Sequence, residues 1–150
     1  MATTHARTTP ASTGLLWGLT ALFALRVFAQ ALQYWAPIDS LPDVAAFQGS
    51  NLPYPVLLSS QLLILLLMCR GNWLAGRGRL VWSDSTRYRA KLAGRIYLAG
   101  SIARIGVGVL MPAAPAWFTS WIPAIFHLVL AAFVLAPDRP VAGPVVVRTD

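Results

Sequence analysis

The chain is poor in acidic residues and in charge of any kind. It contains no glutamate, and its five acids are Asp39, Asp43, Asp84, Asp138 and Asp150, all outside the long apolar runs. Glycosidases and aspartic proteases need two facing carboxylates, and a Ser–His–Asp triad needs an acid beside its histidine. No acid has that placement near His127, so we predict that the protein is not an enzyme.

Metal-ligating residues are almost as scarce. Cys69 is the only cysteine, and the two histidines are His5 and His127. One cysteine excludes an intrachain disulfide and any multi-cysteine metal site. Structural zinc needs about four ligands, so we predict no metal site and no bound cofactor.

Apolar residues are abundant instead. Hydrophobic residues make up 57% of the 150 residues and charged residues only 11%, against about 25% charged in ordinary soluble domains. A soluble protein of this composition would have too little polar surface, so lipid is the solvent that the composition favours.

Four long apolar runs predict transmembrane helices, each close to the roughly 20 residues that cross a bilayer core of about 30 Å. They cover residues 14–35, 54–73, 92–110 and 117–136. The predicted fold is therefore an all-α integral membrane protein, a four-helix bundle over residues 14–136 with tails at 1–13 and 137–150. The loop 36–53 holds three prolines, and we expect a short interfacial turn around residues 44–47.

The distribution of basic residues predicts the orientation. The loops after the first and third runs hold no Lys or Arg, whereas the stretch from Arg70 to Arg95, between and at the ends of the second and third runs, holds seven of the twelve. Because basic loops stay cytoplasmic, both termini are predicted inside, in an inner (plasma) membrane of bacterial type. We expect lipid head groups to contact Arg77, Arg79, Arg87, Arg89 and Lys91. No nucleic-acid motif accompanies these residues.

Polar side chains inside the apolar runs are the candidate functional residues, because hydrocarbon makes them costly. They share one face of each helix at three- and four-residue spacing. We predict a polar seam through the bundle that opens outward and serves as a ligand or partner site. Its members are Arg26, Gln30, Gln33, Gln61, Ser101, Arg104 and His127, with Tyr97 beside them.

The seam contains two arginines and no carboxylate, although arginine stays protonated in proteins. A buried unpaired charge is unfavourable by several kcal/mol. The acceptor must be a backbone or Gln carbonyl, water, a lipid phosphate, an anionic ligand, or a carboxylate of another subunit.

This charge gives the leading functional hypothesis. We predict a non-catalytic subunit or accessory factor of a larger membrane complex, or a homo-oligomer, in which a partner or lipid neutralises Arg26 and Arg104. The alternative is a binding or transport module for an anionic lipid, quinone or organic anion. A third hypothesis is a haem or pigment protein that uses His127 as its single ligand.

Four glycines in the third run, Gly94, Gly100, Gly106 and Gly108, permit close helix packing, within the chain or between subunits. In size and helix count the chain is similar to small bacterial four-span families such as the DoxX-like proteins. Leu25-Arg26-Val27 also resembles the arginine segment of their first helix. We take no function from this resemblance.

Overall fold

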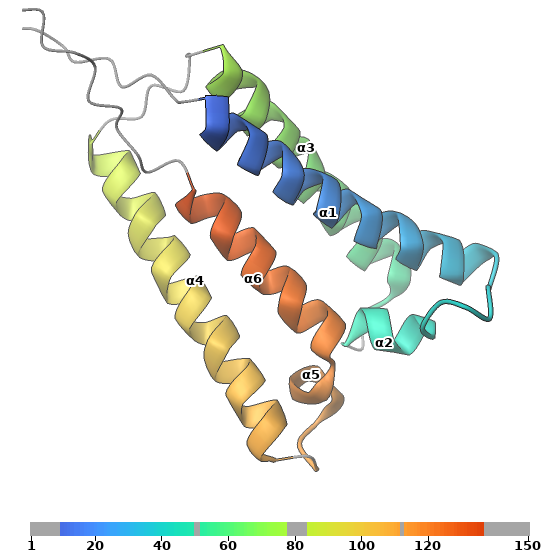
Figure 1. Cartoon of the computed structure of the whole chain (residues 1–150). Coiled ribbons are helices and arrows are strands. Elements are labelled where there is room, and N and C mark those ends of the chain that lie inside the picture. The colour runs from blue at the N-terminus through green and yellow to red at the C-terminus, as the bar shows by residue number, and fades with distance from the viewer. Residues whose placement is uncertain (1–9, 50–51, 78–83, 112, 137–150) are drawn as a thin grey trace, which may run out of the picture.

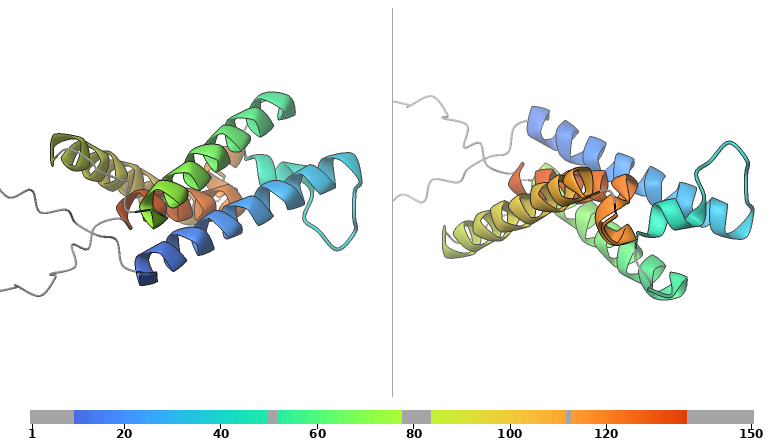
Figure 2. Two further views of the ribbon diagram at one scale, coloured as in Figure 1. Left: turned by 90° about the horizontal axis from the view of Figure 1, so that it is seen from above. Right: turned by 90° about the horizontal axis from the view of Figure 1, so that it is seen from below.

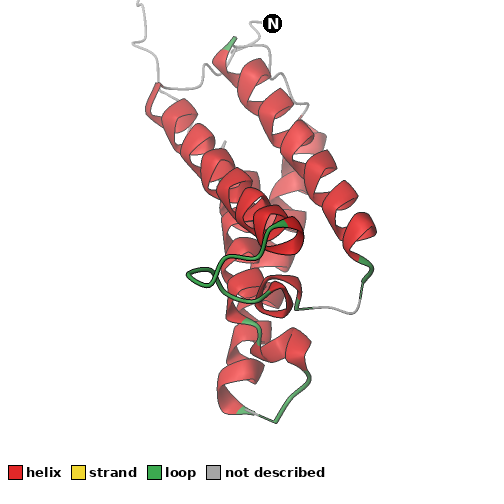
Figure 3. Cartoon of the chain, turned by 90° about the vertical axis from the view of Figure 1, so that its right-hand side faces the viewer, coloured by secondary structure: helices red, strands yellow, loops and turns green. Residues whose placement is uncertain are grey.

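The computed structural model describes residues 10–49, 52–77, 84–111 and 113–136, and within them every regular element is a helix (Figure 3). The order is α1 (Pro10–Trp35), α2 (Val44–Gln48), α3 (Tyr54–Gly76), α4 (Asp84–Leu110), α5 (Ala116–Thr119) and α6 (Trp121–Leu135). The all-helical class is therefore confirmed for the described residues, and the turn expected around residues 44–47 is the short helix α2.

Three of these helices are long and apolar enough to cross a membrane, over Thr13–Trp35, Tyr54–Gly76 and Ser85–Leu110. The fourth predicted span differs from the observed structure. It is divided into α5 and the 15-residue α6, which is about 22 Å long at 1.5 Å per residue.

Proline explains the division of the fourth span. Ser120 has an extended conformation, with φ −73° and ψ 99°, between the end of α5 and the start of α6. Pro123 follows in the first turn of α6, where its missing N–H breaks no helical hydrogen bond. One continuous helix would instead press the Pro123 ring against the carbonyl of Thr119, four residues earlier.

Two other helices begin earlier than the hydropathy pattern predicts. The first begins at Pro10, inside the predicted tail, and α4 begins at Asp84 rather than near residue 92. The first two turns of α4 are polar but contain Ala, Arg and Lys, which are good helix formers, and no glycine or proline. Helix propensity therefore extends α4 beyond its apolar part. The predicted irregular tail 137–150 lies outside the described residues.

The helices form two hairpins, α1–α3 and α4–α6, which meet where α1 packs against α6 (Figures 1 and 2). Phe23, Val27 and Met68 form a buried cluster, and Phe126 and Leu130 of α6 pack against it. The short helices α2 and α5 lie together at one end of the bundle, opposite the start of α1 (Figure 1). The end of α3 and the start of α4 lie at the other end (Figure 1).

Several polar side chains are buried and many large apolar side chains are exposed, the reverse of the usual arrangement in a soluble protein. Gln30 and Asn72 are fully buried, whereas Leu25 and Leu66 are 63% and 65% exposed. Only 33%, 17% and 17% of the most apolar windows of α1, α3 and α4 are buried inside the chain. The outer surface is therefore suited to hydrocarbon, and the interior holds the polar groups.

Candidate functional site: a buried cationic cavity

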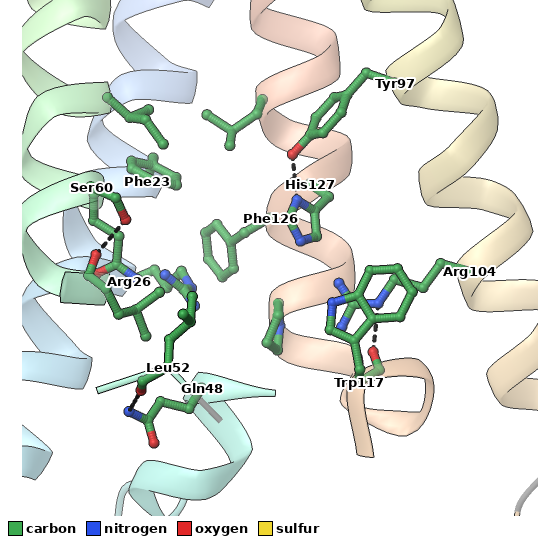
Figure 4. Close-up of a pocket in the computed structure, with 15 residues that line it drawn as sticks. Phe23, Arg26, Gln48, Leu52, Ser60, Tyr97, Arg104, Trp117, Phe126 and His127 are labelled. Atoms are coloured by element: carbon green, nitrogen blue, oxygen red, sulfur yellow. Dashed lines mark hydrogen bonds between the residues drawn. The ribbon is translucent and has the colours of Figure 1, made fainter. Parts of the chain in front are cut away.

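A cavity of about 250 Å³ lies between the two hairpins. Its wall combines side chains from α1, α3, α4 and α6 with residues of the two short helices (Figure 4). The polar and aromatic side chains of the wall include Arg26, Ser60, Gln61, Tyr97, Arg104, Trp117, Phe126 and His127. The cavity thus brings together residues that the sequence separates by about one hundred positions.

Arg26 reaches the cavity from α1. It is 7% exposed, and its Nη2 donates a hydrogen bond of 2.8 Å to the carbonyl oxygen of Phe47 in α2. Its guanidinium carbon lies 5.4 Å from the centre of the Phe126 ring, a favourable cation–π distance. The Nε of Arg26 has no hydrogen-bond partner in the described part of the chain.

Arg104 reaches the cavity from α4. It is 4% exposed, and its Nε donates a hydrogen bond of 2.6 Å to the carbonyl oxygen of Trp117 in α5. Its guanidinium carbon lies 4.4 Å from the centre of the Trp117 ring. Both terminal nitrogens, Nη1 and Nη2, are buried and lack a hydrogen-bond partner among the described residues.

The two arginines therefore use backbone carbonyls and aromatic rings in place of carboxylates. A carbonyl satisfies one N–H group but does not neutralise the positive charge. No carboxylate of the described residues bonds to either guanidinium. Two unneutralised cations with unused N–H groups thus line one mostly apolar cavity.

Two glutamines join the helices of the first hairpin. Gln61 of α3 donates from its Nε2 to the Oε1 of Gln30 of α1, at 3.1 Å. Gln61 lines the cavity, and its own Oε1 has no hydrogen-bond partner in the described residues. The cavity wall therefore offers an acceptor as well as cationic donors.

Three predicted site residues, Gln30, Gln33 and Ser101, do not line the cavity. The Oε1 of Gln33 accepts a hydrogen bond of 2.9 Å from the backbone N–H of Ile38 and so fixes the loop after α1. The hydroxyl of Ser101 donates to the carbonyl of Tyr97 within α4, at 2.8 Å. Gln33 and Ser101 each form a hydrogen bond with a backbone group nearby in the chain, so we assign them a structural role.

His127 lies in the cavity wall and is bonded to Tyr97. The Tyr97 hydroxyl and the His127 Nδ1 form a hydrogen bond between α4 and α6, which Figure 4 shows. The Nδ1 of His127 is thus engaged within the chain, and a haem or pigment held by His127 stays a prediction. We therefore treat His127 as a wall residue joined to α4.

The residues predicted to meet lipid head groups gather near the junction of α3 and α4. Arg77 follows the last turn of α3, and its guanidinium carbon lies 3.7 Å from the centre of the Trp73 ring. Arg87 and Arg89 are exposed on the first turns of α4, where Lys91 is half-buried. Arg79 lies outside the described residues.

Three features of the interior were missed in the sequence. The short helices α2 and α5 supply the carbonyl acceptors for Arg26 and Arg104. Asn72 is fully buried and donates to the hydroxyl of Thr20, at 2.9 Å. Asn72 lies near the end of the predicted span 54–73 and was not among the predicted site residues.

Known proteins give no guide to this site. No protein family, curated protein or solved structure matches the chain. Within the described residues, no group of three His, Cys, Asp or Glu side chains is placed to hold a metal ion. The cavity and its two arginines are therefore the features from which a function can be inferred.

Proposed function

We propose that the chain is a four-span membrane protein with both termini and the α3–α4 connection in the cytoplasm. The three long apolar helices support this, as does the basic charge beside the α3–α4 connection, opposite α2 and α5. In a Cys69→Ser background, an impermeant thiol reagent added outside cells should label Asp43→Cys. Labelling of Arg87→Cys under the same conditions would contradict this orientation.

We propose further that the protein binds an organic anion in the cavity between its hairpins. The observation that carries this proposal is that Arg26 and Arg104 line the same cavity with buried N–H groups that have no partner among the described residues. The remaining wall is mostly aromatic and aliphatic, which suits a ligand with one anionic group and an apolar body. Gln61 would accept a hydrogen bond from a protonated or hydroxylated part of such a ligand.

A ligand inside the chain fits the arginines better than an acid on a partner subunit. Arg26 and Arg104 are 7% and 4% exposed, so a partner's carboxylate would have to enter the cavity to reach them. A small anion of suitable shape needs no such insertion. The role of an accessory subunit therefore stays a prediction, and the geometry favours the binding module.

Charge-assisted hydrogen bonds give the expected size of the effect. Each is worth about 1.5–3 kcal/mol. Loss of both guanidinium groups should therefore weaken binding by at least about a hundredfold, which corresponds to roughly 2.7 kcal/mol.

Binding of radiolabelled laurate to the protein in phosphatidylcholine nanodiscs tests the proposal, with empty nanodiscs subtracted. The Arg26→Gln/Arg104→Gln variant should lose the binding, and neutral dodecanol should not compete for it. The matched control is Arg87→Gln/Arg89→Gln, which removes the same charge from exposed positions and should bind within about twofold of the unmodified protein. Equal binding by the cavity variant and the unmodified protein would refute the proposal.

A further inference from the structure

The cavity lies between two helices that do not pack against each other. Its wall includes residues of α3 and of α4, yet these two helices are not among the packed helix pairs of the described structure. Figure 1 shows α6 between α4 and the first hairpin. The side of the bundle between α3 and α4 therefore lacks a packed helix pair among the described elements.

Two wall residues on that side are exposed. Ser60 of α3 is exposed, and Tyr97 of α4 is 39% exposed. They come from opposite walls of the cavity, as Figure 4 shows. The wall is thus accessible on the side of the bundle where the surrounding helix faces carry exposed leucine and isoleucine, such as Leu63 and Ile96.

The end near α2 and α5 is closed by tight contacts. Gly49, just after α2, has φ +55°, and a Cβ atom there would lie 3.0 Å from Ser120 and from Pro123. The Arg26 and Arg104 hydrogen bonds hold α2 and α5 to the long helices. The two short helices therefore cover this end of the cavity, and the outward opening of the seam stays a prediction.

The opposite end is filled by side chains. Phe23 and Met68 are buried there, with Leu130 and Phe133 packed against them. Further along the first hairpin, Asn72 bonds to Thr20 and to the carbonyl of Leu16. Protein occupies both ends, and among the described residues the exposed part of the wall lies on the side between α3 and α4, at Ser60 and Tyr97.

We infer that the ligand is a single-chain amphiphilic acid that enters sideways from the lipid, between α3 and α4. This inference rests on the proposed anion site and names its ligand class and route. The anionic group lies at Arg104 and Arg26. The cavity of about 250 Å³ holds the head and first carbons of the chain, and the rest of the chain extends past Ser60 into the bilayer.

Adjacent serines allow a matched test of this route. Ser59 and Ser60 are both exposed, and each hydroxyl donates to a backbone carbonyl one turn earlier. Only Ser60 lines the cavity. Ser60→Cys and Ser59→Cys, each in a Cys69→Ser background in phosphatidylcholine nanodiscs, are reacted with N-ethylmaleimide while laurate, or butyrate as the water-soluble short acid, is present.

Saturating laurate should slow the reaction of the cysteine at position 60 at least about tenfold and leave position 59 within about twofold. Butyrate at the same concentration should protect neither cysteine. Arg26→Gln/Arg104→Gln should abolish the protection by laurate. This pattern would support both the ligand class and the side route.

Three results would overturn the route while the anion site stands. The first is Arg-dependent laurate binding that leaves the cysteine at position 60 as reactive as before. The second is Arg-dependent butyrate binding as tight as that of laurate, which would indicate a water-soluble ligand. Equal protection of both cysteines would reflect a general effect of laurate on the bilayer and would also overturn it. Absence of any Arg-dependent laurate binding would refute the proposed function itself.

Discussion

The two hairpins share the same order of helices but differ in how their long helices pack together. In each, a long helix carries a buried arginine that donates to a carbonyl of the short helix that follows it: Arg26 to Phe47, and Arg104 to Trp117. A third helix then returns toward the start of the hairpin.

The difference lies in how the long helices are held together. In the first hairpin, amide side chains bridge α1 and α3, through Gln30 with Gln61 and through Thr20 with Asn72. In the second hairpin, glycine allows close approach. A Cβ atom at Gly94 would lie 2.9 Å from Leu135 of α6, and one at Gly108 would collide with the Phe118 carbonyl of α5.

The two arginines also differ in which of their nitrogens are hydrogen-bonded. In Arg26 a terminal nitrogen is engaged by the backbone, whereas in Arg104 only Nε is engaged and both terminal nitrogens lack partners among the described residues. A guanidinium binds an anion most strongly with two parallel N–H groups. Arg104 therefore has two terminal nitrogens available to the proposed anion, whereas one terminal nitrogen of Arg26 is already engaged.

The largest expected effect is the loss of laurate binding, which should be greater for substitution of Arg104 than of Arg26. Arg104→Gln should weaken laurate binding by up to about a hundredfold, because it removes a bidentate donor worth roughly 1.5–3 kcal/mol. Arg26→Gln should weaken it by about tenfold or less. Equilibrium binding of radiolabelled laurate measures both variants. A larger loss for Arg26→Gln would contradict the expectation that Arg104 binds the anion more strongly.

A smaller effect is expected for glycine contacts in the second hairpin. Gly108→Ala should destabilise the protein by about 1–3 kcal/mol, the usual range for overpacking, because α5 must move away from α4. A Cβ atom at Gly106 would meet nothing within 4 Å, so Gly106→Ala is the control and should be neutral or slightly stabilising. Thermal unfolding in mild detergent, followed by circular dichroism, measures both; equal stability of the two variants would contradict the close α4–α5 contact.

The smallest effect concerns the amide bridge of the first hairpin. A double-mutant cycle of Thr20→Val and Asn72→Leu should give a coupling energy of about 0.6–1.7 kcal/mol, the range for hydrogen bonds between membrane helices. The same cycle between Thr20→Val and the exposed Ser59→Ala should give a coupling near zero. A zero coupling for the first pair would show that packing alone joins α1 to α3.

Much of the helical organisation could be predicted from the sequence. The apolar runs indicated α1, α3 and the apolar part of α4, because a bilayer-length run of such residues has few other stable conformations. The start of α4 was missed, since its residues are polar yet have high helix propensity. The break at Ser120 was missed as well, although Pro123 is the residue that explains it.

The candidate site was only partly predictable. Polarity inside an apolar run was enough to single out Arg26, Gln61, Arg104 and His127, which share the cavity. It could not separate them from Gln33 and Ser101, because local hydrogen bonding depends on backbone positions. The carbonyls of Phe47 and Trp117 could not be foreseen at all, since every residue carries a carbonyl and only the fold selects two of them.

By itself, the sequence determined that the chain is helical and apolar, and that its interior arginines have no carboxylate close to them in the chain. Those properties are local, since they follow from residue type and spacing along one helix. Only the tertiary structure decided that the two arginines share a cavity, that α2 and α5 cover its end, and that α3 and α4 leave its side less closely packed. These depend on contacts between helices far apart in the chain, where packing geometry decides which polar atoms find a partner.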